Sequence, residues 1–274
     1  MHSESGLVDI LATDEVEATA NAKKLMSYFQ GETAPPTEPD QRILRFLVPE
    51  NRKRVYDMRR VINALADEGS FLELKPLHAA GMITGLLRVS GKPMGLIANN
   101  PMHLGGAIDA AASGKAAAFM RQCDMLGLPI LSLCDTPGFM VGPHSEEQGA
   151  VQQACDLISA GAGLKVPLVF VCLRKGYGIG AQAMAGGSFA APVSALAWPT
   201  GEFGPMGLEG SVQLGYKREL DMQSTPAARE ELFDRLVEES YQRGRAINVA
   251  SLLEIDAVID PIETRRWVMA SLAL

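Results

Sequence analysis

The sequence predicts an α/β protein built on a mostly buried sheet. From Met82 onward, apolar runs of strand length alternate with runs of helical periodicity, which is typical of crossover units on such a sheet. Glycine-rich stretches follow several of the apolar runs, where loops are expected. The 274 residues are 47% hydrophobic and include 27 glycines, an ordinary composition for a globular protein with a sizeable core.

Composition also narrows the function classes. A formal charge of -7 and a pI near 5.2 oppose nonspecific nucleic-acid binding, which needs a cationic surface. No apolar run approaches about 18 residues, and the N-terminus lacks the basic and apolar regions of a signal peptide. We therefore expect a soluble cytoplasmic protein without nucleic-acid or membrane partners. The four cysteines form no C-x-x-C pair and lie in apolar segments, so we expect them to be reduced, buried and structural.

The first 40 residues are expected to form a connector. Residues 15–29 have the spacing of an amphipathic helix, with Thr13 or Asp14 available as the N-cap. Residues 31–40 contain three prolines and three acids, which predicts a linker. The predicted division is an N-terminal connector helix and linker over residues 1–40 and a main domain over residues 41–274.

The main domain is expected to begin with a helix over residues 54–67, ended near Gly69, and a strand over residues 71–74. A basic cluster lies at the start of this region, formed by Arg52, Lys53, Arg54, Arg59 and Arg60. These side chains could bind phosphates or carboxylates, but a solvated helix face with ion pairs is the favoured interpretation.

The remaining elements follow the alternation of apolar runs. The predicted strands are residues 83–89, 94–98, 130–134, 168–173 and 195–198. One helix is predicted over residues 107–126, with its apolar face at Ile108, Ala112, Phe119, Met120, Cys123 and Leu126. Further helices are predicted over residues 146–160, from Pro226, and from about Pro261. We expect these last two helices to pack on a flank or form oligomer contacts.

Three glycine-rich loops follow predicted strands, where ligands gather in open α/β sheets. They are residues 98–109, 134–149 and 174–187. In the third, Gly178 and Gly180 allow backbone amides to turn toward one point, and the following helix start adds unpaired N–H groups. Such a loop can hold an oxyanion without a catalytic side chain, although it can equally be a tight connection that binds nothing.

Few side chains in these loops suit acid–base catalysis. His103 and His144 could carry protons, but the favoured interpretation is that both are polar loop residues without partners. Asp135 could act as a base, but we favour a carboxylate that caps its own turn. No nucleophile elbow, Walker loop or zinc motif is present. Positioned backbone amides remain, and they can stabilise an enolate or another oxyanion that develops on the substrate. The expected substrates are thioesters or ureido groups.

Several strings together resemble one known family, the carboxyltransferase β-type subunits of biotin-dependent acyl-CoA carboxylases such as propionyl-CoA carboxylase. The resemblance covers the second, C-terminal half of those subunits, over about residues 40 to 215. The strings occur in the family's order and are LVPENRKRVYDMRRVI, GSFLEL, MITGLLRVSGKPMGLIANNP, GKAAAFMRQCDMLGLPIL, DTPGF, RKGYGIGA and AWPTGEFGPMG. The resemblance implies a crotonase-like fold.

The resemblance also implies an activity, namely transfer of a carboxyl group from carboxybiotin to the α-carbon of an acyl-CoA. Carried onto this sequence, the catalytic oxyanion hole is the backbone amides of Ile179 and Gly180. The residues implied to bind biotin are Gly138, Phe139, Gly178 and Ala181. Gln182 is implied to shape the acyl substrate, at a position that is often acidic in relatives. A side chain at Ile179 departs from the family pattern, and no metal is implied.

The resemblance further implies partners, since only one of the family's two halves is matched. A CoA-binding half would be needed, and the chain is expected to be either a fragment or a natural half-subunit. The chain lacks a biotinyl-lysine motif and an ATP-binding glycine loop, so biotin would be carried by a biotin carboxyl carrier or biotin carboxylase subunit. We also expect a homo-oligomer. A biotin-dependent acyl-CoA decarboxylase component and a non-catalytic assembly subunit remain as alternatives.

Overall fold

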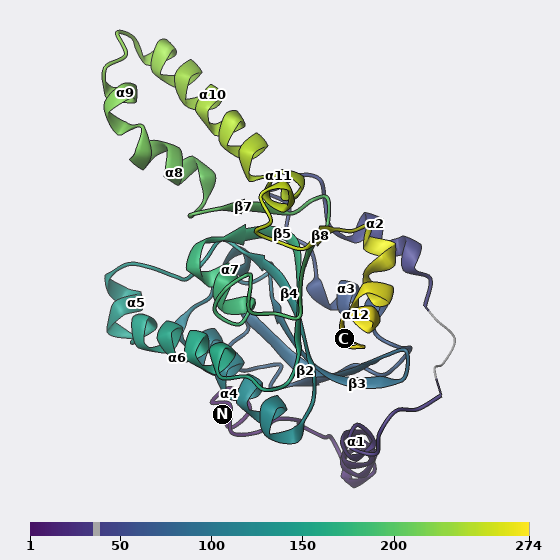
Figure 1. Cartoon of the computed structure of the whole chain (residues 1–274). Helices are drawn as coiled ribbons and strands as arrows, with labels where there is room; N and C mark the ends of the chain where they lie inside the picture. Colours follow the sequence, from purple (N-terminus) through teal and green to yellow (C-terminus); the bar gives the residue numbers. More distant parts are fainter. Residues whose placement is uncertain (35–38, 274) are drawn as a thin grey trace.

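An eight-stranded mixed sheet forms the centre of the molecule (Figure 1). The computed structural model describes residues 1–34 and 39–273. The strands are β1 (Leu72–Leu74), β2 (Met82–Val89), β3 (Lys92–Asn99), β4 (Ile130–Thr136), β5 (Leu168–Tyr177), β6 (Ser194–Ala197), β7 (Glu202–Gly204) and β8 (Ala257–Val258). The spatial order is β1-β2-β3-β4-β5-β6-β8, and β7 pairs with the end of β5.

The type of strand pairing changes once across the sheet. Strands β1, β2 and β3 pair antiparallel, and β3 to β6 and then β8 pair parallel. Ser90 and Gly91 connect β2 to β3 with φ values of 53° and 83°, which the right-handed twist of a hairpin favours. The parallel strands need crossover helices, and these cover the faces of the sheet.

The helices in the described residues are α1 (Glu15–Ser27), α2 (Leu44–Leu47), α3 (Met58–Leu65), α4 (Ala110–Leu126), α5 (Pro143–Glu147), α6 (Ala150–Ala162), α7 (Gly178–Met184), α8 (Leu208–Gly215), α9 (Lys217–Asp221), α10 (Pro226–Gly244), α11 (Ala246–Ser251) and α12 (Thr264–Ser271). Short 3₁₀ turns are η1 (Gln41–Ile43), η2 (Leu104–Gly106) and η3 (Pro261–Glu263). None of the helices in this part of the chain is long and apolar enough to cross a membrane.

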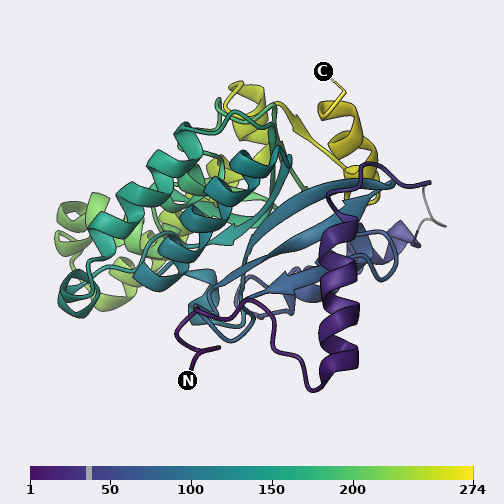
Figure 2. The same ribbon diagram turned by 90° about the horizontal axis from the view of Figure 1, so that it is seen from below.

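Two apolar cores lie on opposite faces of the sheet, because alternate strand residues point to opposite sides. On one face, α4, α6 and α7 pack over residues such as Ile97 and Phe170. On the other face, α2, α3 and α12 pack over residues such as Leu96 and Val171. Figures 1 and 2 show the two layers of helices with the sheet between them.

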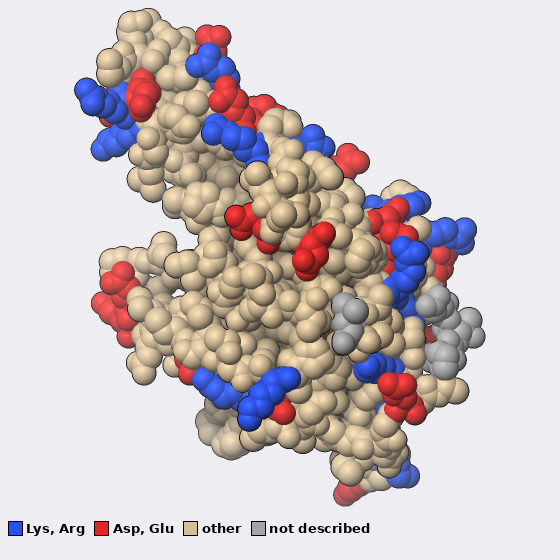
Figure 3. Space-filling view, in the orientation of Figure 1, with Lys and Arg blue, Asp and Glu red and all other residues tan. Residues whose placement is uncertain are grey.

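Helices α8, α9 and α10 form an arm that projects from the body (Figure 1). We call this segment, residues 208–244, the arm. Its helices pack on one another through a small apolar cluster that includes Val212, Leu220 and Leu236. Its outer surface carries many charged side chains of both signs (Figure 3). The arm joins the body beside β7.

The five strands predicted in the main sheet, and the strand predicted over residues 71–74, are confirmed, with ends shifted by at most four residues. The helix predicted over residues 54–67 is shorter, since α3 begins at Met58, after Asp57 caps it by accepting from the Arg59 amide at 3.0 Å. The helix predicted over residues 146–160 is interrupted at Gly149, whose φ is 74°, so the structure has α5 and α6. Leu126 was expected on the buried face of α4, but it is exposed.

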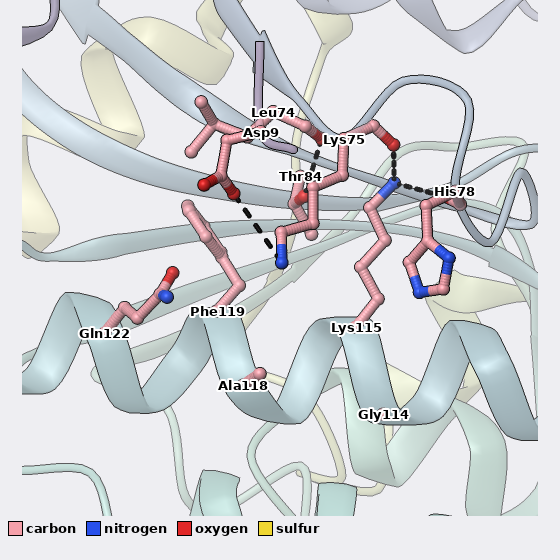
Figure 4. Close-up of a pocket in the computed structure, with 10 residues that line it drawn as sticks. All are labelled: Asp9, Leu74, Lys75, His78, Thr84, Gly114, Lys115, Ala118, Phe119 and Gln122. Carbon is pink, nitrogen blue, oxygen red and sulfur yellow. Dashed lines mark hydrogen bonds and ion pairs between the residues drawn. The ribbon is translucent and has the colours of Figure 1, made fainter. Parts of the chain in front are cut away.

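The N-terminal residues pack against the body. Helix α1 is present, with Asp14 as its N-cap, but none of its residues is buried, so its apolar face contributes little. Of the predicted linker, residues 35–38 lie outside the described residues, and the division at residue 40 stays a prediction. Figure 4 shows a small pocket near Asp9 in which the Lys115 ammonium donates to the carbonyls of Lys75 and His78. The ammonium also donates to the Met82 carbonyl. These bonds satisfy all three donors of Lys115, so this pocket is structural.

Candidate active site

The three glycine-rich loops meet at the carboxyl ends of β3, β4 and β5. Gly106 lies so close to Asp135 that a Cβ atom would be 2.2 Å from the Asp135 carbonyl oxygen. The Ile108 amide donates to the Gly138 carbonyl at 3.0 Å, and the Met140 amide donates to the Ile108 carbonyl at 2.8 Å. The first two loops are therefore joined by backbone contacts.

The third loop meets the second at two glycines. A Cβ atom on Gly180 would be 2.7 Å from the Cα atom of Gly138 and 3.1 Å from the Phe139 nitrogen. Gly178 has a φ of 59°, and its Cβ would lie 2.6 Å from the Pro205 carbonyl oxygen. Contacts this short exclude any side chain, so both positions need glycine. We call residues 178–180 the amide turn.

The amide turn is also the start of α7. The first amides of a helix have no partner within the helix, and they carry a partial positive charge. Tyr177 is the N-cap residue, and no side chain makes a capping hydrogen bond there. The amides of Ile179 and Gly180 are therefore suited to hold an oxygen that carries negative charge.

An apolar cavity of about 520 Å³ opens beside the amide turn. Its walls come from residues 137–141, from α6, from the amide turn and from residues 205–207. Glu146 is the one charged residue among those that line it in the described part of the chain. An apolar pocket with a few convergent polar groups is the usual form of a small-molecule site.

The structure brings most of the predicted site residues together. Gly138, Phe139, Gly178, Ile179 and Gly180 all line the apolar cavity. The Ile179 side chain is 62% exposed and stands at the cavity wall.

Two predicted residues lie elsewhere. Ala181 is fully buried in the core, and Gln182 is exposed on α7, and neither lines the apolar cavity. The roles of all seven residues stay predictions.

Asp135 does not cap its own turn, contrary to the favoured expectation. Thr136 does so, because its Oγ1 accepts from the Gly138 amide at 3.1 Å. Asp135 is fully buried and forms an ion pair with Arg174 at 3.0 Å, and its second oxygen accepts from the Lys175 amide at 3.2 Å. A buried carboxylate paired in this way is a structural tie between β4 and β5.

The loop histidines lie outside the apolar cavity. His103 was expected to lack a partner, but its Nε2 lies 3.7 Å from an Asp109 carboxylate oxygen. The ring of His144 makes a hydrogen bond to Gln148 at 3.1 Å. Neither histidine lines the apolar cavity, and His144 lies in α5 rather than in a loop.

The cysteines differ from one another. All four are free, and Cys123, Cys134 and Cys172 are buried, as expected. Cys155 is exposed, which corrects the expectation that all four are buried, and it lines the apolar cavity. Burial raises the pKa of the Cys123 thiol to about 12, and burial raises the pKa of Cys172 well above its usual range. No group of acidic, histidine and cysteine side chains in the described residues could hold a metal ion.

A second, polar cavity of about 480 Å³ shares Pro137 and Gly207 with the apolar cavity. Its lining includes Arg52, Lys53, Lys175, Tyr177, Glu202, Glu209 and Tyr241. Arg52 pairs with Glu202, and Arg59 pairs with Glu73 at 2.6 Å. These two residues of the basic cluster therefore form ion pairs, as the favoured interpretation expects.

Sequence reasoning missed the polar cavity and the short strand β7. One signal was present, because Glu202 is the only charged residue between Lys175 and Glu209. A single charge in so long an uncharged stretch indicates a buried pair.

Comparison with known proteins gives a consistent result. The family model "Carboxyl transferase domain" matches residues 1–274. The propionyl-CoA carboxylase beta chain of Saccharopolyspora erythraea is 34% identical over 293 residues, covering 100% of this chain and 54% of that protein. The methylmalonyl-CoA carboxyltransferase 12S subunit of Propionibacterium freudenreichii subsp. shermanii is 33% identical, covering 98% of this chain and 52% of that protein. This chain thus spans about half the length of these curated relatives.

Solved structures agree. A single-chain, multi-domain long-chain acyl-CoA carboxylase superposes with a TM-score of 0.90 at 51% identity, over 98% of this chain and 27% of that chain. The transcarboxylase 12S structure with methylmalonyl-CoA and methylmalonic acid bound has a TM-score of 0.90 at 32% identity, over 99% of this chain and 54% of that chain.

Proposed function

This chain belongs to the carboxyl transferase domain family, with the crotonase-like fold, and on that premise we propose that it is the biotin-facing half of an acyl-CoA carboxyltransferase. The observation that carries the proposal is the amide turn, with the uncapped start of α7 at the wall of an apolar cavity. Relatives named for propionyl-CoA and methylmalonyl-CoA support acyl-CoA as the substrate class.

The residues present fit a biotin group. The cavity walls are apolar, and the amides of the amide turn can donate to a ureido oxygen. Biotin carried on a partner protein would supply the carboxyl group and, after its release, accept the α-proton of the thioester. The amides of Ile179 and Gly180 would donate to the ureido oxygen and stabilise its negative charge, and Gly138 and Phe139 would form part of the wall of the biotin site. Ala181 follows the turn in sequence and is fully buried in the core, so it would anchor the turn to the core.

The other half of the site is proposed to come from a CoA-binding carboxyltransferase half, because this chain spans about half of its relatives. A biotin carboxyl carrier or biotin carboxylase subunit is the proposed carrier of biotin. We also propose a homo-oligomer, because large apolar side chains around the cavity are exposed, including Val141, Val151 and Met206. The related transcarboxylase 12S protein forms a hexamer assembly, which supports this proposal. A cytoplasmic location stays a prediction, as does the role of Gln182 in acyl selection.

The test is a partner-dependent assay. The chain is purified with and without a candidate CoA-binding half, and transfer of the carboxyl group from malonyl-CoA or methylmalonyl-CoA to free biotin is measured. We expect turnover only with both halves. Gly180→Pro removes one of the two amide donors and should abolish this turnover. Full activity of Gly180→Pro in a folded assembly would refute the amide-hole mechanism.

A binding test needs no partner. Cys155 is the exposed thiol at the cavity wall, and the other three thiols are buried, so a thiol reagent should modify one cysteine per folded chain. Free biotin bound in the apolar cavity should slow this modification, and a Cys155→Ser variant should not react. Equal rates of modification with and without saturating biotin would count against a biotin site in this cavity.

A further inference from the structure

A network of side chains supports the amide turn through Tyr177, the residue that precedes it. Tyr177 immediately precedes the turn and is 3% exposed. Its hydroxyl donates to a carboxylate oxygen of Glu202 at 3.1 Å. Glu202 lies on β7, which pairs in parallel with the end of β5. Tyr177, the residue just before the amide turn, is thus hydrogen-bonded to β7, a strand that follows the turn in sequence.

The network continues from Glu202 to the arm. The other oxygen of Glu202 accepts a hydrogen bond from Nε of Arg52. The Arg52 guanidinium lies 3.7 Å from the centre of the Tyr241 ring, a stacked cation–π contact. The Tyr241 hydroxyl on α10 donates to Glu209 on α8 at 2.9 Å. We call these five residues the Tyr177–Glu209 network.

The buried carboxylate of Glu202 constrains the arrangement of this network. Glu202 is 8% exposed, and a buried carboxylate is stable only with partners such as Arg52 and the Tyr177 hydroxyl. Burial, with a contribution from the nearby Glu202 charge, raises the pKa of Tyr177 far above its usual value, so this hydroxyl stays a donor. In the network Arg52 therefore pairs with Glu202, and each of the two tyrosine hydroxyls donates to a carboxylate.

Packing ties the same residues to the turn and to the arm. Tyr177, Leu208 and Tyr241 form an apolar cluster of their own, with Leu208 at the start of the arm. Pro205, between β7 and the arm, lies against Gly178, since a Cβ there would be 2.6 Å from the Pro205 carbonyl oxygen. A shift of β7 or of the arm base would therefore move the amide turn.

An oxyanion hole needs its donors held within about 0.5 Å of their working positions. The start of α7 has no side-chain cap to do this. Resting on the proposed function above, we propose that the Tyr177–Glu209 network positions the Ile179 and Gly180 amides for carboxyl transfer, with Tyr177 and Glu202 as positioning residues. The network acts on the turn through Tyr177.

The experiment uses the chain assembled with its CoA-binding half, and it measures kcat, KM for the acyl-CoA and thermal stability. Tyr177→Phe keeps the packed ring but removes the bond to Glu202, and we expect kcat to fall about tenfold with KM changed less than twofold. Glu202→Leu should match it. Glu202→Gln keeps an acceptor for Tyr177 and should retain most of kcat. This rescue separates positioning from a merely structural role, because all three variants alter the same buried pair.

Glu239→Gln on α10 is the matched control, since Glu239 pairs only with arm residues at the surface and should leave kcat unchanged. A kcat for Tyr177→Phe within twofold of wild type would overturn the proposal. So would equal losses for Glu202→Gln and Glu202→Leu. If the wild-type assembly shows no carboxyl transfer and biotin does not protect Cys155, the proposed function fails as well. Wild-type turnover with an active Tyr177→Phe variant overturns the network alone.

Discussion

Gly180 lies where the second and third glycine-rich loops approach each other, so the proposed site has no room for a side chain at this position. In Gly180→Ala, the added methyl would lie 2.7 Å from the Gly138 Cα and 2.9 Å from its carbonyl carbon. Backbone cannot move aside as a flexible side chain can, so α7 and the loop that contains Gly138 must separate. Loss of one aligned donor costs about 10²-fold to 10³-fold in turnover. We expect a loss of this size in the two-half assay.

The matched control for this prediction is Gly215→Ala. Gly215 is in α8, and nothing lies within 4 Å of the position of an added Cβ. Alanine there favours the helix by up to about 1 kcal/mol. We expect wild-type turnover and equal or higher thermal stability. If Gly180→Ala and Gly215→Ala behave alike, the close approach at Gly180 does not matter for catalysis.

Single residues were predictable where the backbone alone sets the requirement. Gly138 and Gly178 have φ values of 115° and 59°, a local need for glycine that the sequence displays, whereas Gly180 needs to be glycine because of its contact with the distant Gly138. Asp135 was misjudged because its partner Arg174 is 39 residues away, and only the pairing of β4 with β5 brings the two together. Glu202 was missed for the same reason, since its partner Arg52 is 150 residues away.

At the scale of elements, one buried ion pair holds the last helix to the sheet. Arg265 on α12 pairs with Asp67 at 2.7 Å, and both side chains are almost fully buried. The carboxylate of Asp67 also accepts from the amides of Ser90 and Gly91 at 2.9 and 2.7 Å. Asp67 therefore joins α3, the β2–β3 turn and α12.

Asp67→Asn should destabilise the fold strongly. The amide group places donors against Arg265 or a backbone N–H, and breaking a buried pair from one side costs about 3 to 5 kcal/mol. The measurement is urea unfolding. Glu263→Gln is the control, since its pair with Arg266 at 2.7 Å is exposed and should be worth less than about 1 kcal/mol. Similar unfolding midpoints for both variants would contradict the role given to Asp67.

Elements were predictable where hydrophobic periodicity is strong. The five main strands were found from the sequence because each is a continuous apolar run. β7 and β8 were missed because they have three and two residues, too few to show a pattern. Helices α8 and α9 have only eight and five residues, and they are held by packing on α10 rather than by their own sequence.

At the scale of the whole molecule, the parallel sheet gathers loops from distant parts of the chain at one edge. The order of the strands, and the two cores that result, come from contacts between elements far apart in sequence. Periodicity predicts that a buried sheet exists but does not determine the order of its strands. The resemblance of many separate strings in one order supplied the crotonase-like fold, because matched order constrains topology where local patterns do not.

Buried tyrosines give the whole fold a predictable response to alkali. Burial raises the pKa of Tyr28 and of Tyr241 to about 12, and burial also raises the pKa values of Tyr56 and Tyr177 well above their usual range. In the unfolded chain these phenols ionise near pH 10. Above that pH the folded state binds more protons than the unfolded state, so the free energy of unfolding must decrease as pH rises.

The predicted window begins at about pH 10.5. Lys115, whose pKa burial lowers to about 8, has the opposite effect, but only up to the ordinary lysine pKa of about 10.4. From there to about pH 12, urea unfolding midpoints should decrease steadily, and Tyr28→Phe should reduce the slope because it removes one of the four shifted phenols. If the urea midpoint did not change with pH, or if Tyr28→Phe left its dependence on pH unchanged, these hydroxyls would ionise as freely in the folded chain as in water.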